Sequence, residues 1–313
     1  MAEVVGPLGR ALTVTGKDAE ARFVGGDVDL LSANALILLR RCAVLEEPQR
    51  ATSGRGGPDR GDDRARLSET AALAWATRTN LGQGGEEAHA LVTAVRRRRM
   101  AAVASLRGAG MTVQMFKLVP DPAVLTGTGE AGAQDVGLAL HGTFGWPVLP
   151  GSTLKGVAHA YSRDTRQPAL SLAQRTKLFG GPRPEARSST DDDAEGSRGE
   201  VTFLDALPFG LVPVTQHVLT PHVTEYYEEP APGMPRKPPA EYYNPVPVPF
   251  LAVEGERSVK GERQECCFLV ALVGPAEAVK EARRLLVEAV AEIGLGAKTA
   301  AGYGYLREGL GAG

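Results

Sequence analysis

The chain has 313 residues, of which 43% are hydrophobic and 23% are charged. This composition is typical of folded globular proteins and excludes a wholly disordered chain. The 35 lysines and arginines and the 37 aspartates and glutamates give a formal net charge of −2. That balance excludes a uniformly cationic protein that coats nucleic acid, so any nucleic-acid contact must come from a local patch.

Apolar patterning and cysteine content bear on the compartment. The longest apolar run, Cys266 to Val273, is far shorter than the roughly 20 residues of a membrane-spanning helix. Residues 1–10 lack the pattern of a secretory signal. Three cysteines, two of them adjacent at Cys266 and Cys267, cannot form a disulfide framework. We therefore expect a cytoplasmic protein with reduced cysteines and no membrane partner.

Residues 1–110 are predicted to form a helical extension. Ser32 or Asn34 can cap a helix from Ala35 to Leu45, and apolar side chains recur at helical spacing from Glu86 to Leu106. Residues 48–67 are rich in Gly, Arg and Asp and contain few apolar side chains. This composition predicts a mobile loop.

Residues 111–313 are predicted to form an α+β domain. Strands are expected at Thr112–Val119, Val201–Leu204, Leu211–Val214 and Cys266–Val273. A helix follows the last strand, with Pro275 at its first position and Gly294 at its end. A strand, a helix and a terminal glycine loop form the pattern of half a ferredoxin-like domain. We therefore expect sheets with helices packed on one face.

Two other segments of this domain lack the pattern of regular elements. Residues 182–200 carry the run Asp191 to Asp193 among Ser, Gly and Arg, which predicts a second mobile loop. Residues 222–250 hold 8 of the 22 prolines and 4 of the 7 tyrosines. This content argues against a helix and predicts an extended, Pro- and Tyr-rich arm.

The segment PGSTLKG, Pro150 to Gly156, is the first candidate binding site. Its two glycines, two hydroxyls and one ammonium are groups that hold an oxyanion or a phosphate. The alternative is a plain turn into a helix that Ser152 or Thr153 caps, with Lys155 exposed to solvent. Both interpretations fit the sequence.

The segment GLGAKTAAGYG, Gly294 to Gly304, is the second candidate. Four glycines around Lys298 and Thr299 allow the backbone to approach a ligand closely. The spacing fits neither a Walker A loop nor a dinucleotide-binding fingerprint. A phosphate backbone is therefore a better ligand than a nucleotide cofactor, and a tight left-handed turn into a last strand is the structural alternative.

Basic and metal-binding residues give weaker signals. Arg96 to Arg99 point in four directions on a helix, so only Arg96 and Arg99 share a face. These arginines could form a solvated helix surface or contact RNA phosphates. The chain contains no HExxH segment and no CxxC pair. We therefore expect no metal and no cofactor.

One enzyme class matches short segments of the chain. Ser152-x-x-Lys155 and Lys298-Thr299-Ala300, with Tyr242 to Asn244 between them, follow the order of the nucleophile motifs of penicillin-binding proteins. The absence of a secretory signal, and Ala300 in place of a glycine, argue against this serine acyl-transferase. It remains the remote alternative.

Taken in order, these segments resemble the RAMP superfamily of CRISPR-associated proteins. LTGTGEAGAQDVGLALHGTFGWPVLPGSTLKG, Leu125 to Gly156, is similar to the first signature of that family. Four later segments follow in the family's order: GEVTFLDALP (199–208), VLTPH (218–222), EYYNPVPVPFLAV (241–253) and GLGAKTAAGYG (294–304). The combination is most similar to the family that forms the sixth subunit of type III-B (Cmr) effectors, and it covers about residues 112–306.

The resemblance implies a modified ferredoxin-like, RRM-type fold whose glycine loops hold guide RNA. It implies a subunit at the end of the effector filament, toward the 3′ side of the guide, that contacts CRISPR guide RNA, target RNA and other Cmr subunits. His222 to Phe250 is the candidate arm. Its tyrosines could stack on bases, and its basic side chains could contact phosphates. The RNA-binding residues that the resemblance implies are Gly151, Ser152, Thr153, Lys155, Gly156, Gly294, Gly296, Lys298, Thr299, Gly302, Tyr303, Gly304 and His222. The composition of the arm adds Arg236 and Lys237.

Two functions from different classes follow. The first is a non-catalytic RNA-binding subunit of a CRISPR effector, and the second is a stand-alone endoribonuclease with His222 or His217 as general base. The net charge of −2 is low for an RNA-binding subunit. It indicates weak RNA binding by the isolated chain, because phosphate contacts supply most non-specific affinity.

Overall fold

The computed structural model describes residues 2–5, 12–14, 21–23, 34–41, 43–46, 66–67, 69–81, 83, 86–129, 138–163, 170–181, 197–220, 226, 238, 245, 247–259 and 261–310. Most of the expected loops 48–67 and 182–200, and most of the expected arm 222–250, lie outside these residues. Among the described residues, no helix combines the length and the apolar character needed to cross a membrane.

The N-terminal part is mixed rather than helical. It contains β1 (Ala2–Val5), β2 (Leu12–Val14), β3 (Ala21–Phe23), β4 (Ala43–Glu46), β5 (Arg66–Leu67), α1 (Ala35–Arg41), α2 (Glu69–Arg78) and α3 (Glu86–Gly108). The five strands form one antiparallel sheet in the order β3-β2-β1-β4-β5. The prediction of a helical extension therefore omitted a sheet, because strands this short find their partners far away in the sequence.

Two predicted boundaries in this part are wrong. The helix expected to reach Leu45 ends at Arg41, since residues 43–45 pair with β1. Residues 66 and 67, expected at the end of a loop, pair with β4. The start of α1 is as predicted, because the Asn34 side-chain oxygen accepts a hydrogen bond from the Leu36 N–H at 3.0 Å.

A five-stranded antiparallel sheet forms the centre of residues 111–313. In chain order, four of its strands and the two helices that pack on it are β6 (Thr112–Pro120), α4 (Gly151–Tyr161), β8 (Thr202–Phe203), β14 (Phe268–Gly274), α7 (Ala276–Glu292) and β15 (Leu306–Glu308). The strand order across the sheet is β15-β6-β14-β8, and β9 (Leu207–Pro208) also pairs with β14. Every residue of β14 is buried, as its unbroken apolar run predicts.

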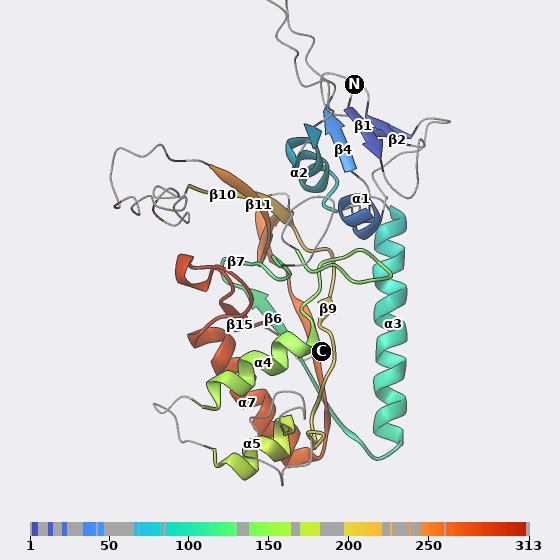
Figure 1. Cartoon of the computed structure of the whole chain (residues 1–313). Coiled ribbons are helices and arrows are strands. Elements are labelled where there is room, and N and C mark those ends of the chain that lie inside the picture. Colours follow the sequence, from blue (N-terminus) through green and yellow to red (C-terminus); the bar gives the residue numbers. More distant parts are fainter. Residues whose placement is uncertain are drawn as a thin grey trace, which may run out of the picture.

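Helices cover both faces of this sheet. Phe116 and Leu118 of β6 belong to the main core together with apolar residues of α4 and α7. Val113, on the opposite face of the same strand, packs with Val103 of α3. Figure 1 shows α3 along one side of the sheet, with α4 and α7 on the other. Helices were expected on one face, so α3 adds a layer that the sequence did not predict.

A second sheet adjoins the first. It consists of β10 (Val214–Leu219), β11 (Val248–Glu254) and β7 (Ala123–Val124), in the order β10-β11-β7, and the hairpin β12 (Glu256–Val259) and β13 (Glu262–Glu265) follows it. The strand predicted at Leu211–Val214 shares only its last residue with β10. Residues 248–250, expected in the arm, begin β11, because they pair with residues 217–219. A further helix of the described residues, α5 (Leu172–Phe179), packs against α4.

Candidate nucleic-acid interface

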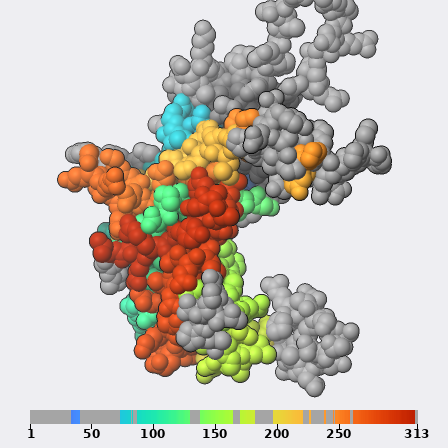
Figure 2. All heavy atoms as spheres, turned by 90° about the vertical axis from the view of Figure 1, so that its left-hand side faces the viewer, coloured from blue at the N-terminus to red at the C-terminus, as the bar shows by residue number. Residues whose placement is uncertain are grey.

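The segment after α7 is an ordered loop that is closed at its base. The Leu295 N–H donates to the Gly304 carbonyl oxygen at 2.7 Å. Gly294, Lys298, Gly302 and Gly304 all have positive φ, and a short 3-10 turn, η4 (Thr299–Ala301), forms the tip. The left-handed turn expected as the structural alternative is therefore present. In Figure 2, which faces this side of the molecule, the C-terminal segment (red) lies at the surface.

The base of this loop packs on the turn that follows β6. The Ala297 N–H donates to the Leu125 carbonyl oxygen at 3.0 Å, and the Gly304 N–H donates to the Ala123 carbonyl oxygen at 2.8 Å. A Cβ at Gly296 would lie 2.0 Å from the Leu125 oxygen, and one at Gly304 would lie 2.2 Å from the Leu295 oxygen. Both glycines are therefore required by contacts within the chain.

The tip of the loop is more accessible than its base. Gly296, Lys298 and Gly302 are exposed, whereas Thr299 and Tyr303 are partly buried and Gly294 and Gly304 are buried. The Lys298 ammonium lies 5.0 Å from the centre of the Phe250 ring, which is within the range of a cation–π contact. Lys298 is thus held over β11 with its charge still accessible.

The segment Pro150 to Gly156 begins α4. Pro150 is the N-cap and provides no side-chain hydrogen bond, so neither Ser152 nor Thr153 caps the helix as the structural alternative expected. The Gly151 N–H instead donates to the Asp205 carboxylate at 2.7 Å. Because this carboxylate occupies the helix N-terminus, an additional anion is disfavoured there.

The accessible groups of this segment lie one turn further along α4. Ser152 and Gly156 are exposed, Thr153 and Lys155 are partly buried, and Gly151 is buried. A Cβ at Gly156 would meet no atom within 4 Å, whereas one at Gly151 would lie 2.2 Å from the Phe203 oxygen. The side chains of Ser152 and Lys155, with the open backbone at Gly156, are therefore the groups that can contact a phosphate chain.

A glycine turn joins the two segments. The Thr126 carbonyl oxygen accepts a hydrogen bond from the Ala139 N–H, and the Thr126 hydroxyl donates to the Val148 oxygen at 3.2 Å. Leu125, next to it, holds the terminal loop. The turn at 125–129 belongs to the quoted RAMP signature but not to the implied RNA-binding residues, and its TGTG sequence was the signal for it.

Tyr303 is fixed by a hydrogen-bonded cluster on the second sheet. Its hydroxyl lies 3.0 Å from His217 Nδ1, and His217 Nε2 lies 2.9 Å from the Thr215 hydroxyl. Thr215 donates its proton to Glu254 at 2.9 Å, which leaves the Thr215 oxygen to accept a hydrogen bond from His217 Nε2. Both ring nitrogens of His217 are therefore engaged within the protein, which disfavours a role as a free general base.

Three implied RNA-binding residues, His222, Arg236 and Lys237, lie outside the described residues, as does Tyr242 to Asn244 of the acyl-transferase alternative. Among the described residues, no hydrogen bond joins Ser152 to Lys155 or Lys298. Within the same part of the chain, no group of three or more His, Cys, Asp or Glu side chains could hold a metal ion.

Comparison with known proteins connects this geometry to a family. A model of the RAMP superfamily matches residues 121–307. The curated relative "CRISPR system Cmr subunit Cmr6" of Pyrococcus furiosus is 26% identical over 231 residues, which cover 59% of this chain and 65% of the relative. The match thus spans less than two-thirds of that relative's length.

Solved structures give related matches. A chain in the "Cryo-EM structure of the Type III-B Cmr-beta bound to cognate target RNA" matches with a TM-score of 0.52 and 16% identity, over 75% of this chain and 74% of that chain. The crystal structure of Cmr6 from Pyrococcus furiosus has a TM-score of 0.36 and 22% identity, over 64% and 99% of the two chains. The first match shows a shared fold. Because the family model covers more than half of its length, this chain belongs to the RAMP superfamily.

Proposed function

We propose that the chain is a non-catalytic RNA-binding subunit of a cytoplasmic type III-B CRISPR ribonucleoprotein effector. In this role it caps the backbone filament near the 3′ side of the guide RNA and contacts guide RNA, target RNA and other Cmr subunits. Membership of the RAMP superfamily and the 26% identity with Cmr6 of Pyrococcus furiosus support the proposal.

We infer that the central sheet is a ferredoxin-like unit. The chain order strand, helix, strand, strand, helix, strand and the sheet order β15-β6-β14-β8 support this inference, because they place the first and third strands in the middle of an antiparallel sheet. An RRM stacks bases on the face of its sheet. Here α3 packs on that face at Val113 and Val273, so we expect RNA to be held by loops instead.

The observation that carries the proposal is the meeting of three glycine-rich segments from distant parts of the chain. Two hydrogen bonds hold the turn at 125–129 in this assembly. The Leu125 carbonyl oxygen accepts from Ala297 of the terminal loop, and the Thr126 hydroxyl donates to Val148 in the segment that leads into α4. Exposed or partly exposed hydroxyl and ammonium groups, on Ser152, Lys155 and Lys298, project from this assembly. Such groups bind a phosphodiester backbone without reading its sequence.

Charge reversal at the two lysines tests this interface. We expect Lys155→Glu and Lys298→Glu each to weaken guide-RNA binding about tenfold, because each replaces a phosphate contact by repulsion. Lys280→Glu is the matched control: Lys280 is exposed on α7, twelve residues before its end, about 18 Å along the helix. Affinities are measured by filter binding, on the chain reconstituted with the other effector subunits and guide RNA. Equal affinities for all three variants would contradict the interface.

The non-catalytic part of the proposal has its own test. We expect the purified chain to leave CRISPR repeat RNA intact in the presence of a chelator, because His217 has both ring nitrogens bound. Cleavage that is lost on His222→Ala or His217→Ala would instead establish the endoribonuclease alternative.

A further inference from the structure

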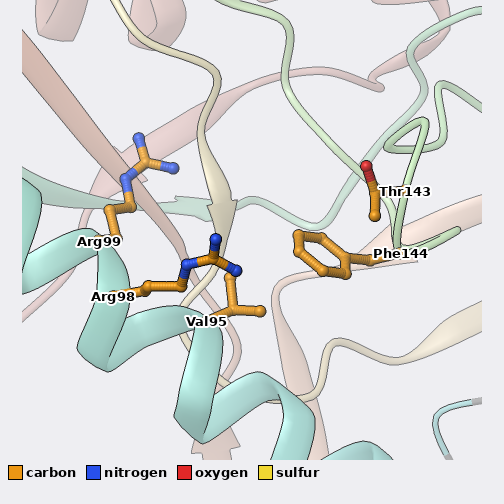
Figure 3. Close-up of a pocket in the computed structure, with 5 residues that line it drawn as sticks. All are labelled: Val95, Arg98, Arg99, Thr143 and Phe144. Carbon is orange, nitrogen blue, oxygen red and sulfur yellow. The ribbon is translucent and has the colours of Figure 1, made fainter.

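A pocket of about 460 Å³ lies between α3 and the turn at residues 141–146. Val95, Arg98 and Arg99 of α3 form one wall, and Thr143 and Phe144 form the other (Figure 3). The volume falls within the range of small-ligand sites. None of these five residues belongs to the interface described above.

The wall opposite α3 is fixed by His141. Its Nδ1 accepts hydrogen bonds from the backbone N–H groups of Thr143 and Phe144 at 3.2 and 3.4 Å. The Phe144 ring stacks with the rings of His141 and Trp146, with centroid distances of 4.7 and 4.8 Å. The Phe144 ring is therefore held in place before any ligand binds, which lowers the entropic cost of binding.

Arg99 leaves one donor unused at the inner end of the pocket. Its Nη2 group donates to the backbone oxygen of Asp205, but its Nε is buried and has no hydrogen-bond partner among the described residues. Burial lowers the pKa of Arg99, and the nearby Asp205 carboxylate opposes that effect. An arginine remains charged even so. An anion bound in the pocket that Arg99 lines would stabilise this partly buried cation.

Arg98 supplies a second guanidinium at the mouth of the pocket. Its side chain is exposed, and within the described part of the chain it makes no salt bridge. Figure 3 shows it between Arg99 and Phe144, with its guanidinium directed toward the ring. The Asp205 carboxylate, which acts on Arg99, already accepts the Gly151 N–H, and no acidic residue lines the pocket beside its two arginines.

We propose that this pocket binds one nucleotide of single-stranded RNA. The phosphate lies against the Arg98 guanidinium, with the buried charge of Arg99 behind it, and the Thr143 hydroxyl offers a further hydrogen bond. The base packs between Phe144 and the plane of Arg98, because aromatic rings and guanidinium planes are the surfaces on which unpaired bases stack. The proposal rests on the proposed function, since it extends the same RNA-binding surface.

Position also favours RNA as the ligand. Asp205 contacts Arg99 through its backbone oxygen and the first residue of α4 through its carboxylate. The pocket and the segment that carries Ser152 and Lys155 are thus joined by one residue.

The test compares two neighbouring arginines in the full-length chain. Binding of fluorescein-labelled U12 single-stranded RNA is measured by fluorescence anisotropy at several salt concentrations. We expect Arg98→Ala to weaken binding about tenfold and to reduce the slope of log affinity against log salt by about 0.7, the value for one phosphate contact on a single strand. Arg97→Ala removes the same charge from an exposed residue outside the pocket, and we expect less than a twofold change.

A second measurement identifies the contact directly. RNA that contains 4-thiouridine is cross-linked by light, and the adduct is mapped by mass spectrometry. We expect an adduct at Phe144 that is lost in the Arg98→Ala variant. Circular dichroism confirms that both arginine variants are folded.

The outcomes separate the pocket from the proposed function. Equal U12 affinities for Arg98→Ala and Arg97→Ala, with loss of binding for Lys155→Glu, overturn the pocket and leave the proposed function standing. Loss of binding for Arg98→Ala alone supports the pocket and overturns the glycine-rich interface. Loss of a protein partner from the Arg98→Ala variant, with unchanged RNA affinity, overturns the pocket as an RNA site.

Discussion

The glycines of the candidate interface differ in what surrounds them. An added Cβ would lie within 2.2 Å of a backbone oxygen at Gly151 and at Gly296, so the fold itself requires these two residues. At Gly156 no atom lies within 4 Å of an added Cβ. The sequence marked all of these glycines alike as places where the backbone could approach RNA, and only the contacts distinguish the structural ones from those available to a ligand.

Substitution by alanine tests this distinction. We expect Gly156→Ala to raise the free energy of unfolding by about 0.5–1 kcal/mol, because alanine is the better residue in a helix. Gly151→Ala should lower it by about 1–3 kcal/mol through overpacking. Both changes in the free energy of unfolding are to be measured by urea denaturation. A Gly156→Ala variant that is less stable than the parent chain would show that this glycine has a structural role.

The turn at residues 141–146 is the element that the sequence described least well. The quoted signature contains it, but nothing in the local sequence shows that it lies against α3. Arg96 to Arg99 do not form one patch, as predicted, but Arg98 and Arg99 line the same pocket although only Arg96 and Arg99 were expected to share a face. Arg96 lies over the Phe209 ring and Arg97 is exposed. These environments depend on residues far away in the sequence, such as Phe209, 113 positions after Arg96.

Protonation of His141 should loosen this turn. Burial lowers the pKa of His141 from its ordinary value, with the Arg99 cation acting in the same direction and the Asp205 carboxylate opposing it. Because the unfolded chain then binds the proton at a higher pH, the contribution of His141 to stability is complete above about pH 6.5 and decreases as the pH falls below that value. In an NMR titration of the histidine C2–H signals, we expect a lower midpoint for His141 in the folded chain than in urea. A midpoint equal to or higher than that in urea would contradict this description.

Regular elements were predictable where their own periodicity was strong. The helix predicted after the buried strand is α7, which buries apolar residues at helical spacing, among them Val279, Ala282 and Leu286, although Pro275 is the N-cap rather than the first helical residue. The buried strand β14 was also predicted from its composition. In contrast, β1 to β5 have only two to four residues each, so they carry no periodic signal. The Asp205 cap of α4 lies 54 residues from its partner.

Across the molecule, the central sheet is covered on both faces, and the groups proposed for RNA binding lie on α3, on α4 and in the terminal loop. The formal net charge of −2 offers little long-range attraction to a polyanion, so affinity depends on local groups such as Lys155, Lys298 and Arg98. We therefore expect RNA binding by the isolated chain to be weak and sensitive to salt. Under the proposed function, neighbouring subunits of the effector supply the additional contacts.

Recovery of the chain from its native cells tests the central claim most directly. The tagged chain is isolated under mild salt, the RNA that it retains is sequenced, and the accompanying proteins are identified by mass spectrometry. The proposed function predicts short RNAs that share one repeat-derived 5′ tag, recovered together with several other effector subunits. A chain recovered alone and without RNA would contradict it.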